Sequence, residues 1–231
     1  MKKVILFLVF ALFLTSFGWS QNRLNAKGLK EGEWTGTYSN GAIRYRGQFH
    51  DGKPYGTFTY FYPTGAVKAK MTYKDQGNSA YVTTYHLNGK PMAKGKFIHH
   101  KKDSTWLYYS ENDGKRVLEE HYENGVKNGP VIVYYAQTGK PSELTEYKNG
   151  KKNGRWIKYF PNGKISSSGF YVNDTLQGNY KVFDITGKPL IEGRYKNGLQ
   201  DGIWTTYDTL GRLKKKVLFR NGLPVKPEKT K

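Results

Sequence analysis

Histidine and carboxylate side chains could bind a metal ion or transfer protons, but their spacing in this sequence argues against both roles. Of the five histidines, only His99 and His100 are neighbours. Adjacent residues of a β-strand point to opposite faces, so these two could not ligate one ion from a strand. Glu119 and Glu120, the closest carboxylate pair, are adjacent in the same way, which is poor geometry for a glycosidase. We expect no metal site and no catalytic carboxylate pair.

Nucleophilic and phosphate-binding motifs give the same result. The sequence contains no cysteine, and the serine run at 166–168 lacks the strand, sharp turn and helix that present a hydrolase nucleophile. No glycine-rich loop leads into a predicted helix, as a phosphate site requires. We expect a protein that is not an enzyme and has no cofactor.

The glycines and aromatic residues recur with a period of 24 or 25 residues in two columns of positions and 23 to 25 residues in a third. One column of positions is Gly41, Gly65, Gly89, Gly114, Gly139, Gly163, Gly187 and Gly211. An aromatic column is Phe49, Tyr73, Phe97, Tyr122, Tyr147, Tyr171, Tyr195 and Phe219. A third column, here called the Trp column, is Trp34, Phe58, Tyr81, Trp106, Val131, Trp156, Tyr180 and Trp204. Such lockstep indicates eight repeat units over residues 27–222.

Each unit is predicted to be two short strands. In the sixth unit the strands are expected over 155–160 and 165–172, joined by a turn at 161–164. The Asn-Gly pair at 149–150 closes the previous unit, and we expect a loop from there to Gly154. Gly and Pro are frequent and no 3.6-residue apolar period is sustained, which disfavours helix. The predicted fold is all-β: a single elongated, curved antiparallel β-meander of about eight β-hairpin repeats.

Strand alternation predicts aromatic side chains on both faces of this sheet. Three residues after the Trp column, and so on the opposite face, lie Thr37, Phe61, Thr84, Tyr109, Tyr134, Tyr159, Phe183 and Tyr207. We predict that Tyr109, Tyr134, Tyr159 and Tyr207 line a binding trough, although both columns could simply fill space. The third and fourth units depart from the pattern, and there Lys101 and Lys102 form a candidate basic loop or an ordinary variable turn.

Residues 1–20 are typical of a secretory signal peptide: two lysines, an apolar run at 4–14 and small residues before a cleavage site between Ser20 and Gln21. The run is shorter than the ~20 residues that span a bilayer. We therefore expect an exported protein, periplasmic or secreted. Because no cysteine follows the apolar run, we expect that it is not a lipoprotein. A short leader at 21–26 precedes the repeats, and a basic tail at 223–231 follows them.

The formal net charge of +20 favours an acidic partner or an anionic surface, or it keeps a β-protein soluble. Export argues against nucleic acid. The charge does not determine an oligomeric state.

The segments "NGKKNGRWIKYFPNGKISSSGFY" (149–171) and "NGLQDGIWTTYDTLGRLKKKVLF" (197–219) resemble the variant MORN repeat, as found in bacterial YwqK-type antitoxin proteins. This resemblance covers nearly all of the chain after residue 20 and implies docking to a partner protein. We therefore expect a binding protein that holds a partner along an aromatic face or a sheet edge, in an antitoxin-like, immunity-like or scaffold role. The alternative is adhesion to an anionic membrane or envelope glycan through lysine-rich loops.

Overall fold

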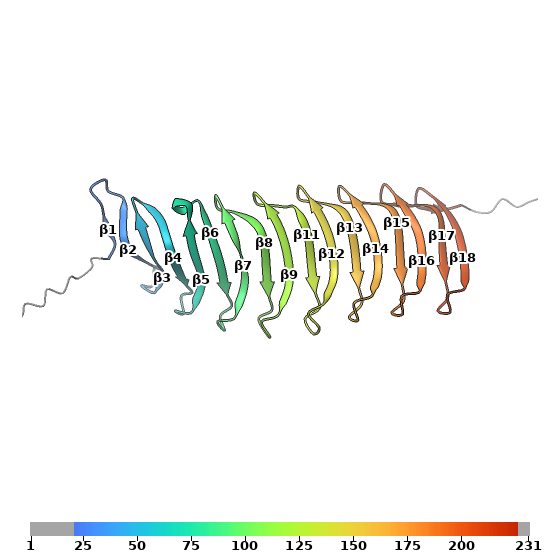
Figure 1. The fold of residues 1–231 in the computed structure, drawn as a ribbon, viewed down its shortest axis with the longest axis horizontal. Helices are drawn as coiled ribbons and strands as arrows, with labels where there is room; N and C mark the ends of the chain where they lie inside the picture. The colour runs from blue at the N-terminus through green and yellow to red at the C-terminus, as the bar shows by residue number, and fades with distance from the viewer. Residues whose placement is uncertain (1–20, 226–231) are drawn as a thin grey trace, which may run out of the picture.

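The computed structural model describes residues 21–225, which form one antiparallel sheet of 19 strands arranged as successive hairpins (Figure 1). The predicted β-meander is confirmed. The predicted signal peptide at 1–20, including Ser20 of the cleavage site, and residues 226–231 of the tail lie outside the described part.

Eight long hairpins correspond to the eight units. They are β2 (Lys30–Thr37) with β3 (Ile43–His50), β4 (Lys53–Phe61) with β5 (Val67–Lys74), β6 (Ser79–Tyr85) with β7 (Pro91–Ile98), β8 (Lys101–Tyr109) with β9 (Arg116–Glu123), β11 (Gly129–Tyr134) with β12 (Pro141–Lys148), β13 (Lys151–Tyr159) with β14 (Ile165–Val172), β15 (Thr175–Phe183) with β16 (Pro189–Lys196), and β17 (Leu199–Tyr207) with β18 (Leu213–Arg220). The short elements are β1 (Arg23–Leu24), β10 (Val126–Lys127), β19 (Leu223–Pro224) and the 3₁₀ turn η1 (Asp75–Gly77).

Two-residue turns join each unit to the next, except that η1 connects the second unit to the third. Asn149 and Gly150 both have positive φ, at 51° and 82°, as a type I′ turn requires, and β13 begins directly after them. The expected loop up to Gly154 is therefore wrong, because residues 151–154 already belong to the strand. The Gly150 amide also donates to the Lys127 carbonyl of the preceding unit over 2.8 Å. Backbone bonds of this kind link successive units along this margin.

A bulge sits beside the turn of every long hairpin. In the second unit, Tyr60 and Phe61 pair with Ala69 and Val67, so Lys68 is the extra residue. The equivalent extra residues of the eight units are Arg44, Lys68, Met92, Val117, Ser142, Ser166, Leu190 and Lys214. At a bulge the side chains no longer point to the two faces of the sheet in strict alternation, which decides where Arg44 and Lys68 lie.

The third unit differs from its neighbours in register. Val82 pairs with Met71 and Gly95, so Val82, and not Tyr81, occupies the Trp-column position. The assignment of Tyr81 to that column was wrong. Neighbouring units enter their first strand through a positive-φ residue and a register shift, whereas β5 and β6 pair without one. Tyr81 consequently lies on the other face and is 56% exposed.

Bulky rings of the Trp column pack over glycines of the adjoining strand. A Cβ on Gly95 would lie 2.3 Å from the Trp106 ring, and one on Gly193 would lie 2.3 Å from Trp204. Phe58, Trp106 and Trp204 are only 2%, 3% and 7% exposed, although no second layer covers the sheet within residues 21–225. The core of this protein is thus a strip of side chains packed sideways along one face.

Candidate functional site

One face of the sheet, here called the aromatic face, carries both the Trp column and the aromatic column. Register places Trp34, Phe58, Trp106, Trp156, Tyr180 and Trp204 in one row. Edge-to-face pairs join this row to the aromatic column, including Phe97 with Trp106 at 4.9 Å and Phe58 with Tyr73 at 5.0 Å between ring centroids. Such geometry is the preferred one for ring pairs and makes a continuous apolar surface.

Lysines from the first strands of several units lie across these rings. Lys102, four residues before Trp106, places its Nζ 4.6 Å from the Trp106 ring, 5.0 Å from Tyr122 and 2.6 Å from the Tyr108 hydroxyl. Lys30 lies in the same way over Trp34 and Phe49 at 4.6 and 4.8 Å. The stacking position is repeated at Lys127 and Lys152, whose Nζ atoms lie 5.4 and 5.1 Å from Tyr147 and Tyr171. Cation–π attraction thus fills part of the aromatic face with the chain's own ammonium groups.

Glu120 is the acidic counterpart of these lysines at the middle of the face. It is 7% exposed, accepts a hydrogen bond from the Tyr122 hydroxyl over 2.8 Å and pairs with Lys127 at 2.7 Å. Burial raises the pKa of Glu120, but the hydrogen bonds from Lys127, Tyr108 and Tyr122 outweigh it and leave the pKa below its ordinary value. The carboxylate is therefore ionised and fully partnered, which suits a structural role and not proton transfer.

An open hollow of about 600 Å³ interrupts the aromatic face across the first three units; we call it the N-terminal hollow. Its aromatic lining includes Tyr45, Phe49, Phe58, Tyr60, Tyr73 and Phe97. Pro54 lies at one side, and Arg44 and Lys68 also line it. Tyr60 and Tyr73 join their hydroxyls across 3.1 Å. Pocket volumes of this size are typical of ligand sites.

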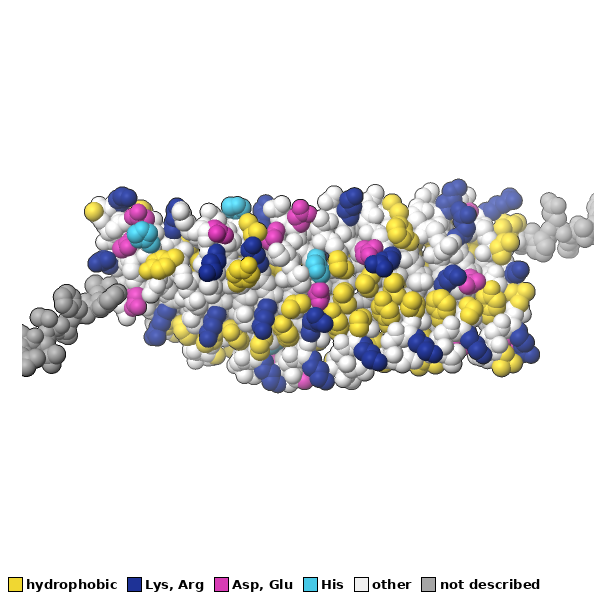
Figure 2. Space-filling model, viewed as in Figure 1, with side chains coloured by type: hydrophobic (Ala, Val, Ile, Leu, Met, Phe, Trp, Pro, Cys, Tyr) yellow, Lys and Arg dark blue, Asp and Glu magenta, His cyan; other side chains and the backbone are white. Residues whose placement is uncertain are grey.

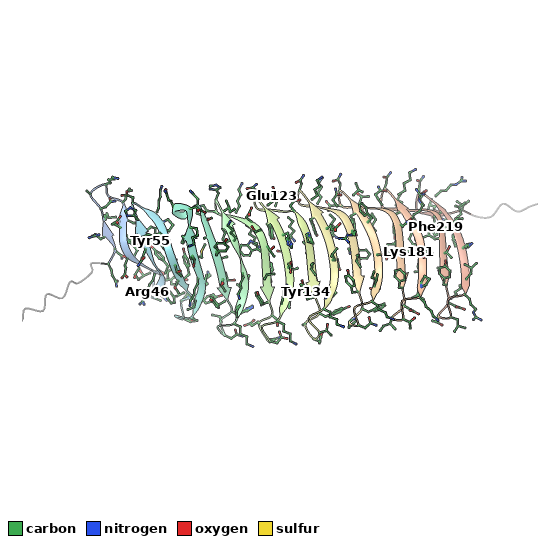
Figure 3. The ribbon with its side chains drawn as sticks, viewed as in Figure 1. Arg46, Tyr55, Glu123, Tyr134, Lys181 and Phe219 are labelled. Carbon is green, nitrogen blue, oxygen red and sulfur yellow. The ribbon has the colours of Figure 1, made fainter. Side chains whose placement is uncertain are left out.

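The four tyrosines predicted to form a trough lie on the opposite face from the Trp column. Tyr134 is 9% exposed, donates to Glu119 over 3.1 Å and has the Arg116 guanidinium 4.2 Å above its ring (Figure 3). Tyr207 donates to Glu192 over 3.2 Å. Tyr109 and Tyr159 are half-buried at the equivalent positions, beside hairpin turns. The structure gives each a packing partner or partial cover, and their role in binding remains a prediction.

The structure separates the two lysines of the candidate basic loop. Lys101 and Lys102 both belong to β8, and the turn before them consists of His99 and His100 with φ of 47° and 62°. Lys102 lies on the aromatic face as described, whereas Lys101 is exposed. They therefore do not act as one basic loop.

Lysines at the hairpin turns reach to the next unit. Lys115 donates to the Ala136 carbonyl over 3.3 Å, Lys140 to Asn162 over 3.4 Å and Lys164 to Thr186 over 2.6 Å. Lys90 bonds to Asn112 in the same way. In Figure 2 a row of Lys and Arg follows the lower edge of the molecule, beside a band of hydrophobic side chains that is broadest over the C-terminal half of the face in view. Much of the loop charge is thus engaged in holding turns together.

Across residues 21–225, no group of three or more His, Cys, Asp or Glu side chains has the arrangement of a metal site. Within the same part of the chain, no helix is long and apolar enough to cross a membrane.

The residues of the N-terminal hollow were not predicted from the sequence. Aligning the units strand by strand could have found them, because Pro54 stands where four other units have lysine, and Arg44 and Lys68 stand where most have neutral residues.

Similarities to solved structures are partial. The crystal structure of a mutant of S. aureus TarM in complex with Fondaparinux, alpha-GlcNAc-glycerol and UDP is 18% identical, with a TM-score of 0.33 over 45% of this chain and 19% of that chain. Another TarM crystal structure gives 18% and 0.30 over 41% and 20%, and TcdB2-TccC3-Cdc42 gives 9% and 0.23 over 82% and 12%. The chain thus spans a fifth or less of the chains it matches. No curated protein matches it.

A family model does match the repeats themselves. The matched residues are 54–75, 152–173 and 200–221, and each segment spans one long hairpin: β4–β5, β13–β14 and β17–β18. The model that these three hairpins match is the one described as MORN repeat variant.

Proposed function

We propose that this chain is a non-enzymatic binding protein that holds a partner protein against its aromatic face. The observation that carries this proposal is the N-terminal hollow, an apolar recess in a face that no second layer covers within residues 21–225. Repeats of the MORN type are generally protein- or membrane-binding modules, which agrees with such a role.

Export, with removal of residues 1–20, is part of the proposal and rests on the sequence of that segment. Two narrower roles fit: neutralising a toxin, as the resemblance to YwqK-type antitoxins implies, and scaffolding in the envelope. The partner's identity would separate them. Intact-mass measurement of exported material should give a chain beginning at Gln21, whereas a membrane-bound chain retaining Met1 would contradict export.

The alternative function, adhesion to an anionic membrane or glycan through loop lysines, is supported by the net charge of +20. The structure makes it the second candidate, because Lys115, Lys140 and Lys164 already donate to carbonyls of neighbouring turns. A lysine bonded in this way must break its contact before it can bind a surface.

Photo-crosslinking distinguishes the two functions. We would place p-benzoylphenylalanine at Tyr45 or Tyr195 on the aromatic face, and at Tyr55, which is 44% exposed on the opposite face, as a control. Exposure to envelope extract should give a discrete protein adduct from an aromatic-face position and none from Tyr55. The adduct should persist from 0.1 to 1 M salt, over which the Debye length falls from about 10 to about 3 Å. Adducts only at low salt, or only from Tyr55, would favour adhesion.

A further inference from the structure

The N-terminal hollow lies where the second and third units, with Pro54 and Ala80, lack a lysine that four other units carry. In the units around Lys30, Lys102, Lys127 and Lys152, a lysine lies over the rings of the aromatic face. The second unit has Pro54 there, paired with Phe49 just as Lys102 is paired with Phe97. Phe58 is buried and Lys30 covers Phe49, but without a lysine at position 54 the half-buried rings of Tyr60 and Tyr73 stay accessible from the hollow.

A second change supplies charge to the same place. The bulge residues Arg44 and Lys68 line the hollow, and the Arg44 guanidinium lies 5.6 Å from the Tyr45 ring. In the next five units the bulge holds Met92, Val117, Ser142, Ser166 and Leu190, and only the last unit is again basic, with Lys214. The first two units also have Ala42 and Ala66 where later units place the turn-linking lysine. In the first two units the basic residue therefore stands at the bulge, as Arg44 or Lys68, and not at the turn.

The lining defines the chemistry of the ligand. Among the described residues, none of those lining the hollow is Asp or Glu, so one guanidinium and one ammonium group face an apolar floor without a counter-charge. A cationic ligand is disfavoured there, and a carboxylate attached to an apolar group is favoured. The lining extends from β3 to β7, and at about 4.8 Å between strands this is roughly 19 Å. That length fits about six residues of extended peptide, at about 3.3 Å each.

From these features we propose that the N-terminal hollow binds an extended segment of the partner protein that carries an aromatic or large aliphatic side chain next to Asp or Glu. The apolar side chain lies on Tyr60 and Tyr73, and the carboxylate pairs with Arg44 and Lys68. This proposal rests on the proposed function and names the part of the partner that is recognised.

The test is selection from a displayed library of random 12-residue peptides with the full exported chain, followed by calorimetry on synthetic copies of the selected peptides. Selected sequences should share an apolar residue beside an acidic one. The double variant Arg44→Glu/Lys68→Glu should lose at least tenfold in affinity. Pro54→Lys, which restores the lysine of other units, should lose a similar factor with the charges of Arg44 and Lys68 intact.

The matched control is Arg46→Glu/Lys70→Glu. Arg46 and Lys70 lie on the same two strands, are exposed and face the other side of the sheet, so their reversal changes the net charge equally. This control should bind as the parent does, and circular dichroism should show all variants folded. Equal losses in both double variants, or selected peptides without an acidic residue, would overturn the proposal. So would displacement of the peptides by vesicles of phosphatidylcholine and phosphatidylglycerol at comparable affinity, which would assign the hollow to a membrane.

The crosslinking experiment tests the assignment of the hollow separately from the proposed function. Partner adducts from Tyr195 with none from Tyr45 would overturn the assignment to the hollow and leave the proposed function standing. Absence of adducts from both positions would remove the proposed function itself.

Discussion

Replacing Gly95 with alanine should destabilise the protein through one defined collision. The new Cβ would lie 2.3 Å from Cδ2 and Cε2 of Trp106 and 2.7 Å from Cγ. Trp106 is 3% exposed, its indole nitrogen donates to the Lys96 carbonyl over 3.2 Å, and its ring meets Phe97 edge to face at 4.9 Å. The ring must therefore shift by more than about 1 Å to restore ordinary contact distances of about 3.5–4.0 Å.

Overpacking of this kind costs about 1–3 kcal/mol, offset by about 0.4–1 kcal/mol from the smaller entropy of the unfolded chain. We expect a net loss of about 1–2 kcal/mol. Gly169→Ala is the matched control, because its Cβ would meet Trp156, Leu176 and Tyr180 at 3.4 Å, which is ordinary contact. That variant should be neutral or gain up to about 1 kcal/mol. At roughly 2–4 °C per kcal/mol for a chain of this size, a difference of about 1–3 kcal/mol should separate the two melting temperatures by about 2–12 °C.

Chemical and thermal unfolding followed by tryptophan fluorescence and circular dichroism would measure the difference. A Gly95→Ala/Trp106→Val double variant should recover part of the combined loss, since valine removes the ring that collides. If Gly95→Ala is as stable as the parent, or Gly169→Ala loses as much, the account of rings packed over glycine is wrong.

Three further outcomes are expected. Replacing Tyr109 and Tyr134 with alanine distinguishes the two faces of the sheet, with the fold checked by chemical denaturation: the folded double variant should still bind a partner held on the aromatic face and should lose binding if the trough predicted from the sequence is used. Glu120→Gln should lower stability at pH 7 and make stability depend less on pH in the acid range. The folded protein holds the pKa of Glu120 below its ordinary value of 4.5, so the stability that this carboxylate contributes is present above pH 4.5 and is lost as the pH falls through the folded pKa. Urea unfolding at several pH values would measure this, and an unchanged dependence of unfolding free energy on pH would contradict it. Deleting Asn149–Lys196, which is two whole units, should leave a folded protein of lower stability. Deleting only 149–164, which removes β13 and its turn, should unfold that region. Equal losses of melting temperature in the two deletion variants would refute the repeat register.

Periodicity made most of this fold predictable, because each turn and each packed ring carries its own sequence signal. Asn149 and Gly150 can adopt the positive φ of a type I′ turn, and glycines stand where rings need room. The register of the third unit was missed although the spacing recorded it: Tyr81 follows Phe58 by 23 residues, whereas Val82, which occupies the column, follows it by 24. A one-residue shift inverts a strand, and choosing the aromatic residue for the column concealed the shift.

The site was less predictable for a related reason. Alternation correctly placed Tyr134 opposite the Trp column, but it did not show that Glu119 and Arg116 cover this tyrosine. Nor could it place Arg44 or Lys68 on the aromatic face, because a bulge breaks alternation there. Cross-strand contacts, which decide what remains open to a ligand, appear only when the strands are paired.

Successive units are linked by different kinds of bond at the two long margins of the sheet, and this makes one margin easier to stretch than the other. One margin is linked by backbone bonds such as Gly150 to Lys127, which have almost no freedom of length. The other is linked by lysine side chains such as Lys115 and Lys140, whose four methylene groups can extend or rotate. Under an applied load the units should therefore separate more along the lysine margin than along the margin with backbone bonds. The strand ladders between units resist most of such a load, and the part contributed by the lysine margin comes from ammonium–carbonyl contacts that the ionic strength of the medium can weaken.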